Sequence, residues 1–303
     1  MVVIITGLFL LAAKRFTLTD AVDLFLLDRE AQNLAAKSLT TYRVRLTRFV
    51  SWCNDQGITT IDDLTTTHVR QYIAGMVRTL KDVTAKNHTV DIKTFLHFCV
   101  DERLLTESPA DRVKLPRVVE RLPQVLTAAE TQRLYKACET DRDKALFLVM
   151  LDTGARCEEV ANMDRADADI DGGTITIREG KPRRDRTAYI SPRTRKELLR
   201  YIKAESINGG ALWRSSTDGA RLRERGISQL LERIADRAEV KCTPHKIRKT
   251  FITTLLRNGV DLFTLMKLSG HRDIESLKPY VAIADVDAEQ AHRQHSPVAS
   301  LLS

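Results

Sequence analysis

The residues best suited to chemistry lie between Thr243 and Tyr280, a stretch that contains the segments TPHKIRKT and LSGH and ends on a tyrosine. The spacing of His245 and Arg248 puts an imidazole and a guanidinium on one helix face, about one turn apart. Pro244 suits the first turn of that helix. A base and a fixed cation would therefore face the same substrate. Tyr280 adds a phenolic oxygen, a nucleophile suited to cutting a phosphodiester covalently and reversing the cut.

Other candidate residues surround this stretch. His271 follows an apolar run of helical spacing that ends at Gly270, so it is expected at a helix-end turn. Upstream, T-G-A-R places Arg156 after a glycine turn, and E-G-K places Lys181 between two strand-like segments. Arg156 and Arg248 could together hold phosphate oxygens, because a guanidinium donates as a bidentate fork and stays charged at every working pH.

In their order and spacing these residues resemble the tyrosine recombinase (phage integrase) family, over roughly residues 17 to 297, and most closely its short Xer-like and simple integrase members. All six positions of the family's catalytic pattern have a counterpart: Arg156, Lys181, His245, Arg248, His271 and Tyr280. The resemblance implies that Tyr280 attacks DNA and forms a 3′-phosphotyrosyl link. It also implies that His245 accepts a proton and that His271 donates to the phosphate.

The leaving 5′-oxygen needs a proton, which Lys181 could deliver from a hairpin. The assignment stays open, because Arg183, Arg184 and Arg186 crowd the same hairpin with charge. Glu159 is expected to support the site by orienting an arginine or a histidine.

Two local departures from the family pattern affect the hairpin and the nucleophile. The family's G-K-G-x-K-x-R is G-K-P-R-R-D-R here, so Pro182 replaces a glycine and restricts the hairpin. Pro279 directly precedes Tyr280, which predicts that the tyrosine lies at a kink or a helix start.

Composition agrees with a nucleic-acid partner. The net charge is +8 and the pI about 9.3, which suits a polyanion. The five cysteines are scattered, which predicts reduced thiols in a cytoplasmic protein. A DNA partner would associate it with the nucleoid. Cys242 and His245 have the spacing of half a zinc site without a second half, and Gly180-Lys181 lacks the rest of a phosphate-binding loop, so neither metal nor cofactor is expected. The apolar opening is too short to span a bilayer.

The length of 303 residues favours two domains, and the pattern predicts a mainly α fold with a small antiparallel β-sheet. We expect an apolar extension over residues 1–16, a helical core-binding domain over 17–106, a proline-containing linker over 107–124 and an α+β catalytic domain over 125–303. The resemblance implies that the first domain is of the SAM-like type and that the two domains clamp DNA.

Helical patterns are predicted at residues 39–53, 66–80, 83–104 and 227–238, and alternating segments at 173–177 and 186–190 predict a hairpin. Thr127 and Glu130 form a capping box that opens the second domain. Candidate phosphate contacts are basic residues in the helix at 39–53, the linker and the hairpin: Arg43, Arg45, Arg48, Lys114, Arg117, Arg183 and Arg184.

These observations predict a site-specific DNA recombinase or integrase that cuts and rejoins double-stranded DNA by transesterification. The resemblance implies that the working form is a homo-tetramer on two DNA sites, assembled through a tail beyond residue 285, and a monomer is the alternative in solution. A type IB topoisomerase shares this chemistry and is the enzymatic alternative. A non-catalytic DNA-binding protein on the same fold is the other.

Overall fold

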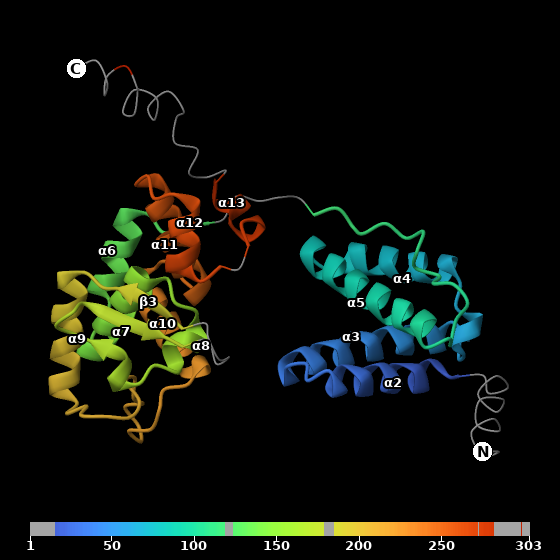
Figure 1. Ribbon diagram of the computed structural model, residues 1–303, viewed down its shortest axis with the longest axis horizontal. Coiled ribbons are helices and arrows are strands. Elements are labelled where there is room, and N and C mark those ends of the chain that lie inside the picture. The colour runs from blue at the N-terminus through green and yellow to red at the C-terminus, as the bar shows by residue number, and fades with distance from the viewer. Residues whose placement is uncertain (1–15, 119–123, 179–184, 272, 282–297, 299–303) are drawn as a thin grey trace. The chain divides into compact units, whose positions relative to one another are not determined.

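The chain divides into two compact units, Met1–Glu120 and Arg121–Ser303. The computed structural model describes residues 16–118, 124–178, 185–271, 273–281 and 298 (Figure 1). The first unit is helical, and the second combines helices with one three-stranded antiparallel sheet. This confirms the predicted mainly α fold with a small sheet. None of the helices in the described part of the chain combines the length and apolar character that crossing a bilayer requires.

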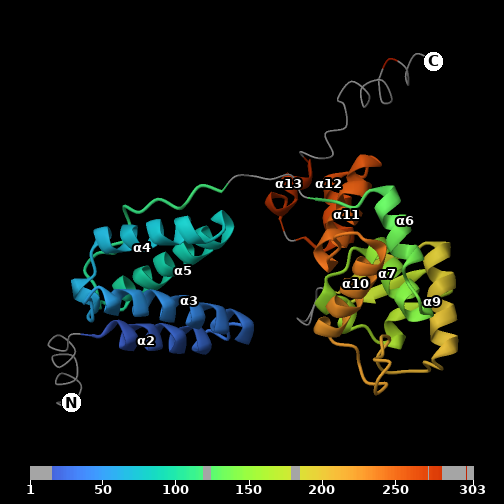
Figure 2. The same cartoon turned by 180° about the vertical axis from the view of Figure 1, so that it is seen from behind.

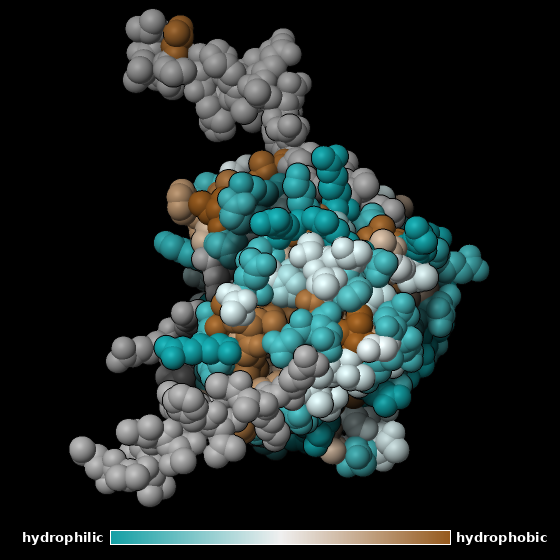
Figure 3. Space-filling view, turned by 90° about the vertical axis from the view of Figure 1, so that its right-hand side faces the viewer, coloured by the Kyte–Doolittle hydropathy of each residue, from teal (hydrophilic) through white to brown (hydrophobic). Residues whose placement is uncertain are grey.

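Within its described residues, the first unit is a bundle of four α-helices and a short 3-10 helix. They are α2 (Leu18–Ala31), α3 (Ala36–Asp55), η1 (Ile61–Asp63), α4 (Thr66–Thr79) and α5 (Asp82–Asp101). In both ribbon views α2 lies beside α3, and α4 and α5 pack against them (Figures 1 and 2). Phe25 is fully buried at the centre, where its ring makes edge contacts with Tyr42, Phe95 and Phe98. The face seen in Figure 3 is mainly hydrophilic, with apolar residues in separate areas.

The beginning of the expected linker packs on this bundle. Ala110 and Val113 are buried in the same apolar cluster as α2–α5. The Lys93 ammonium donates to the backbone carbonyls of Ala110, at 2.8 Å, and Val113, at 2.9 Å. The first unit therefore extends beyond residue 106, to at least Val113. The linker residues Lys114 and Arg117 are exposed.

The second unit opens with the predicted capping box, in which Thr127 and Glu130 bond each other's backbone N–H groups. Its main elements are α6 (Ala128–Lys136), α7 (Asp141–Thr153), α8 (Cys157–Ala161), η2 (Arg165–Asp167), β1 (Ala168–Asp169), β2 (Thr174–Ile177), β3 (Arg186–Tyr189), α9 (Pro192–Ala204) and α10 (Glu224–Ala238). The strands follow the order β1-β2-β3. The predicted hairpin is confirmed as β2 and β3, with Ile175 opposite Ala188. The sequence pattern did not indicate β1, which is only two residues long.

The chain ends its described part in α11 (Pro244–Arg257), α12 (Leu262–Ser269), η3 (Glu275–Leu277) and α13 (Lys278–Val281). α11 joins two apolar clusters of the second unit. Ile247 belongs to the large cluster around α7, and Phe251 belongs to a smaller cluster with residues of α12 and α13. Figure 2 shows α12 and α13 gathered beside α11. One helix thus fixes the histidine and arginine of the motif relative to the rest of the site.

Candidate active site

The turn between α7 and α8 presents the first arginine. Gly154 ends α7 with φ +57, and a Cβ there would collide with the ring of Phe251, so the position requires glycine. Arg156 follows as the N-cap residue of α8, with its side chain 46% exposed. A fixed turn therefore presents this partly exposed guanidinium at the surface of the second unit.

Glu159 lies behind that guanidinium and is saturated by two arginines. Its Oε1 accepts from Nη1 of Arg156, at 2.7 Å, and from Nη1 of Arg186, at 3.1 Å. Its Oε2 accepts from the Arg156 backbone N–H and from Nη2 of Arg186, both at 2.8 Å. Burial acts to raise the pKa of Glu159, but hydrogen bonds and charge from Arg186, then from Arg156, lower it overall. The carboxylate therefore stays ionised and bonds both the backbone and the side chain of Arg156.

Arg248 is buried on α11 and is held by two backbone carbonyls. Its Nη1 donates to the carbonyl of Gly154 at 2.6 Å, and its Nη2 donates to that of Ser269 at 2.7 Å. Burial, then the charge of Arg156, lowers the pKa of Arg248 to about 10, so the side chain still carries its charge at neutral pH. Two helix-end turns, one after α7 and one after α12, therefore fix this cation.

His271 follows the turn that ends α12, as predicted. Gly270 has φ +68, and Arg156 Nη2 lies 3.4 Å from its carbonyl oxygen. The imidazole lies between Ser269, whose Oγ is 2.6 Å from Nδ1, and Arg248, whose Nη2 is 3.4 Å from Nε2. Burial, followed by the charges of Arg248, Arg156 and Arg186, lowers the pKa of His271 to about 4. The ring is therefore neutral at neutral pH.

Arg186 is a site residue whose role the sequence analysis missed. Its side chain is only 9% exposed, forms the ion pair with Glu159 and passes over Gly270, where a Cβ would lie 2.8 Å from Nη1. A signal for this exists in the alternation of β3: Arg186 shares a face with buried Ala188, while Thr187 and Tyr189 are exposed. Arg186 is thus an inward-facing anchor rather than one more charge on the hairpin.

His245 lies at the N-terminal end of α11 and is exposed. Partial burial, then the charges of Lys249 and Arg248, lowers the pKa of His245, so the neutral ring can accept a proton near neutral pH.

Tyr280 follows Pro279 in the short helix α13, which confirms the predicted helix start. Its ring is 6% exposed, and burial raises the pKa of Tyr280 while the charge of Arg248 opposes this. Lys181 lies outside the described residues.

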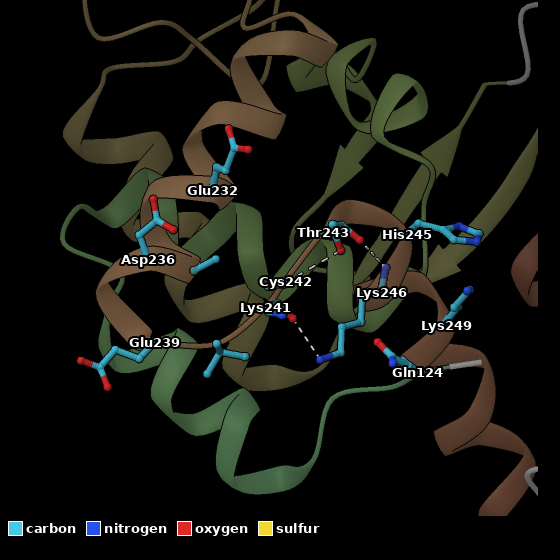
Figure 4. A pocket seen from close by; sticks show the side chains of 12 residues that line it. Gln124, Glu232, Asp236, Glu239, Lys241, Cys242, Thr243, His245, Lys246 and Lys249 are labelled. Carbon is cyan, nitrogen blue, oxygen red and sulfur yellow. Dashed lines mark hydrogen bonds between the residues drawn. The ribbon is translucent and has the colours of Figure 1, made fainter. Parts of the chain in front are cut away.

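A pocket of about 740 Å³ opens beside His245. Its lining includes carboxylates of and after α10, from Glu232, Asp236 and Glu239, and lysines at 241, 246 and 249. In Figure 4, His245 and Lys249 point away from the three carboxylates. The edge that carries His245 is thus the cationic one, which suits a neighbouring phosphate chain.

The electrostatic balance of the site favours an anion. Three guanidiniums, of Arg156, Arg186 and Arg248, lie around one carboxylate, of Glu159, so positive charge predominates among these described groups. Their partners fix these groups before any ligand arrives. Among the residues that the structure describes, no group of three or more histidine, cysteine or acidic side chains is arranged to hold a metal ion. The three arginines are therefore well placed to stabilise a phosphate.

The candidate phosphate contacts of the first unit differ from one another. Arg43 and Arg48 are exposed on α3. Arg45 instead donates to Asp91 of α5, at 2.6 Å, so its charge is already paired with an acid that lies 46 residues away. Arg183 and Arg184 lie outside the described residues.

Comparison with known proteins finds family models that match both units of the chain. A model of the phage integrase family matches residues 124–286, and a model of the phage integrase N-terminal SAM-like domain matches residues 23–103. The tyrosine recombinase XerC of Listeria monocytogenes serovar 1/2a is 28% identical over 282 residues, which cover 88% of this chain and 93% of that protein.

Two solved structures share the fold. The Tn1549 transposon integrase in complex with a circular intermediate DNA has a TM-score of 0.75 at 17% identity, covering 92% of this chain and 99% of that one. The lambda integrase tetramer bound to a Holliday junction has a TM-score of 0.69 at 17% identity, covering 85% of this chain and 78% of that one.

Proposed function

The chain belongs to the phage integrase family, and we propose that its second unit cuts and rejoins double-stranded DNA through a phosphotyrosine at Tyr280. As a member of this family it is a tyrosine recombinase, and site-specific recombination is its function. The observation that carries the assignment of residues is the preformed anion site of Arg156, Arg186 and Arg248 around Glu159.

Within that site, Arg156 and Arg248 would hold the non-bridging oxygens of the scissile phosphate. Arg156 has a side chain that is 46% exposed, and Nη1 of Arg248 keeps an N–H beyond the one it gives to the Gly154 carbonyl. Donors fixed in advance in this way each contribute roughly 3–4 kcal/mol to stabilising the transition state. Buried Arg248 would set the position of the phosphate, and partly exposed Arg156 would donate to it from the surface.

Proton transfer would then fall to the remaining groups. His245, neutral near pH 7 and exposed beside Lys249, would accept the proton of the attacking tyrosine. Lys181 would protonate the leaving 5′-oxygen, which becomes a 5′-hydroxyl. A 5′-hydroxyl produced in the same way by cleavage of a second strand would later attack the phosphotyrosine and displace Tyr280. No water and no external energy source are needed, because the phosphotyrosine bond keeps the energy of the broken link.

The test of this function uses a duplex selected from a random-sequence pool by binding. A recombinase should form a covalent adduct at one position of the selected site and should convert two such sites into a Holliday junction. Relaxation of supercoiled DNA at many sequences without junctions would indicate topoisomerase activity instead. Binding without any adduct would indicate a non-catalytic DNA-binding protein.

We expect the affinity for duplex DNA to fall steeply with salt, since the net charge is +8 and exposed arginines lie on α3. Replacing Arg43 by glutamine should reduce the slope of log K against log salt by about 0.9, the value of one phosphate contact. Replacing Arg45 by glutamine is the matched control, because Arg45 is paired with Asp91. Its loss should lower the free energy of unfolding and leave the slope of log K against log salt nearly unchanged. A slope near zero for the intact protein would contradict the proposal.

We also propose that four copies act together on two DNA sites, in the cytoplasm with the nucleoid. The lambda integrase of the same fold was solved as a tetramer on a Holliday junction, and the tail of this chain, which apart from residue 298 lies outside the described residues, carries apolar positions at 298, 301 and 302. Truncation after Ala284 should leave binding to a single site within about twofold and reduce synapsis of two sites at least tenfold. Native gel shifts with one-site and two-site DNA would separate these effects. Full-rate recombination by the truncated protein would give the tail another role.

A further inference from the structure

The buried side chain of Ser269 contacts His271 in a way that decides which ring nitrogen carries the proton. Ser269 is fully buried at the end of α12. Its Oγ donates to the carbonyl of Leu265 at 2.6 Å and lies 2.6 Å from Nδ1 of His271. A hydroxyl has one proton, and a carbonyl can only accept. Since that proton goes to Leu265, the contact with the ring requires Nδ1 to be the donor.

The opposite end of the ring gives the same answer independently. Nε2 of His271 lies 3.4 Å from Nη2 of Arg248. A guanidinium has donors only, so a hydrogen on Nε2 would bring two donors face to face, whereas a lone pair there accepts. The arrangement at both nitrogens therefore favours the neutral ring with hydrogen on Nδ1 and a lone pair on Nε2.

The charges around the ring keep it neutral while DNA is absent. Arg248 on α11, Arg156 on α8 and Arg186 on β3 add to burial in lowering the pKa of His271, and Asp273 acts in the opposite direction. A neutral ring of this tautomer cannot donate from Nε2. The donor role expected of His271 from the family therefore needs a further step.

We propose that Ser269 is a positioning residue that holds His271 in the Nδ1–H form, so that Nε2 faces the phosphate site as an acceptor and donates to the phosphate only after taking up a proton. The proton comes from solvent when the phosphate's negative charge offsets the three guanidiniums. Nδ1–H stays on Ser269 throughout, and Nε2 releases its proton when the DNA leaves. The tautomer stands by itself, and the uptake step rests on the proposed function.

The tautomer can be measured in the free protein by NMR of ¹⁵N-labelled histidine, with His271→Gln used to assign the signals. At pH 7 we expect a pyrrole-type Nδ1 and a pyridine-type Nε2 for His271. Ser269→Ala removes the acceptor and should move the ring toward the other tautomer, whereas Ser269→Thr keeps the hydroxyl and should preserve it. Ser276→Ala, which alters an exposed serine bonded to the Asp273 carbonyl, is the control and should change nothing.

A pyrrole-type Nε2 in the intact protein would overturn the proposal, as would an unchanged tautomer in folded Ser269→Ala. The uptake step is tested separately, by titrating His271 in Tyr280→Phe protein with and without a selected duplex. The phosphate should raise the pKa of His271 by about 1–3 units, the usual effect of an opposite charge within a few ångströms. A complex with no rise would overturn the uptake step. Failure to bind any duplex would count against the proposed function and leave the tautomer result standing.

Discussion

Replacing Tyr280 by phenylalanine should abolish the covalent protein–DNA adduct while leaving DNA affinity and folding close to those of the intact protein. The change removes one oxygen and keeps the ring, which is 6% exposed and packs in the apolar cluster of α11, α12 and α13. Burial already raises the pKa of Tyr280, so its phenolate is even rarer in the free protein than the roughly one part in a thousand of an ordinary tyrosine at pH 7. No other group would replace this oxygen as nucleophile.

The measurement uses a duplex nicked beside the cleavage point, so that the short fragment diffuses away and the adduct accumulates. Tyr189→Phe and Tyr201→Phe are matched controls, and both should form adduct at nearly the normal rate. Tyr189 is exposed, and Tyr201 is buried, stacks on Trp213 and accepts from the backbone N–H of Arg214. Adduct that persists in Tyr280→Phe, or that maps to either control tyrosine, would show that the nucleophile is assigned wrongly.

Those site residues that belong to a local motif could be predicted from the sequence. His245 and Arg248 share a helix turn, and Gly154 and Gly270 mark the turns that present Arg156 and His271. Each of these signals spans only a few residues. The hairpin and the capping box of Thr127 and Glu130 are equally local and are confirmed for the same reason.

Contacts between distant segments could not be predicted in this way. Arg45 reaches Asp91 across 46 residues, and Arg186 reaches Glu159 across 27. In both cases a basic residue in a basic stretch pairs with an acid from another element. The pattern of charges along the chain does not indicate which acid that is. Ser269 is a different case: it lies two residues before His271 in the sequence, but its role depends on where Arg248 lies.

The loss of Lys181 should slow cleavage of ordinary DNA by about 10²–10⁴, the usual effect of removing a general acid. Lys181 lies outside the described residues, but β3, which follows it, begins at Arg186, whose guanidinium is fixed on Glu159. The hairpin is therefore tied to the anion site at one end. Lys181 stands five residues before that anchor in the sequence, which is why we assign the general acid to it.

A sulfur in place of the bridging 5′-oxygen separates proton donation from charge stabilisation. It leaves as a thiolate whose conjugate acid has a pKa of roughly 8.5, so it scarcely needs a proton. Lys181→Ala should therefore cleave the sulfur substrate nearly as fast as the intact protein does. Arg156→Ala is the control, because its exposed guanidinium supplies charge rather than a proton, and sulfur should not restore its rate. If sulfur instead restores Arg183→Ala or Arg184→Ala but not Lys181→Ala, the acid is one of those arginines and the role given to Lys181 is wrong.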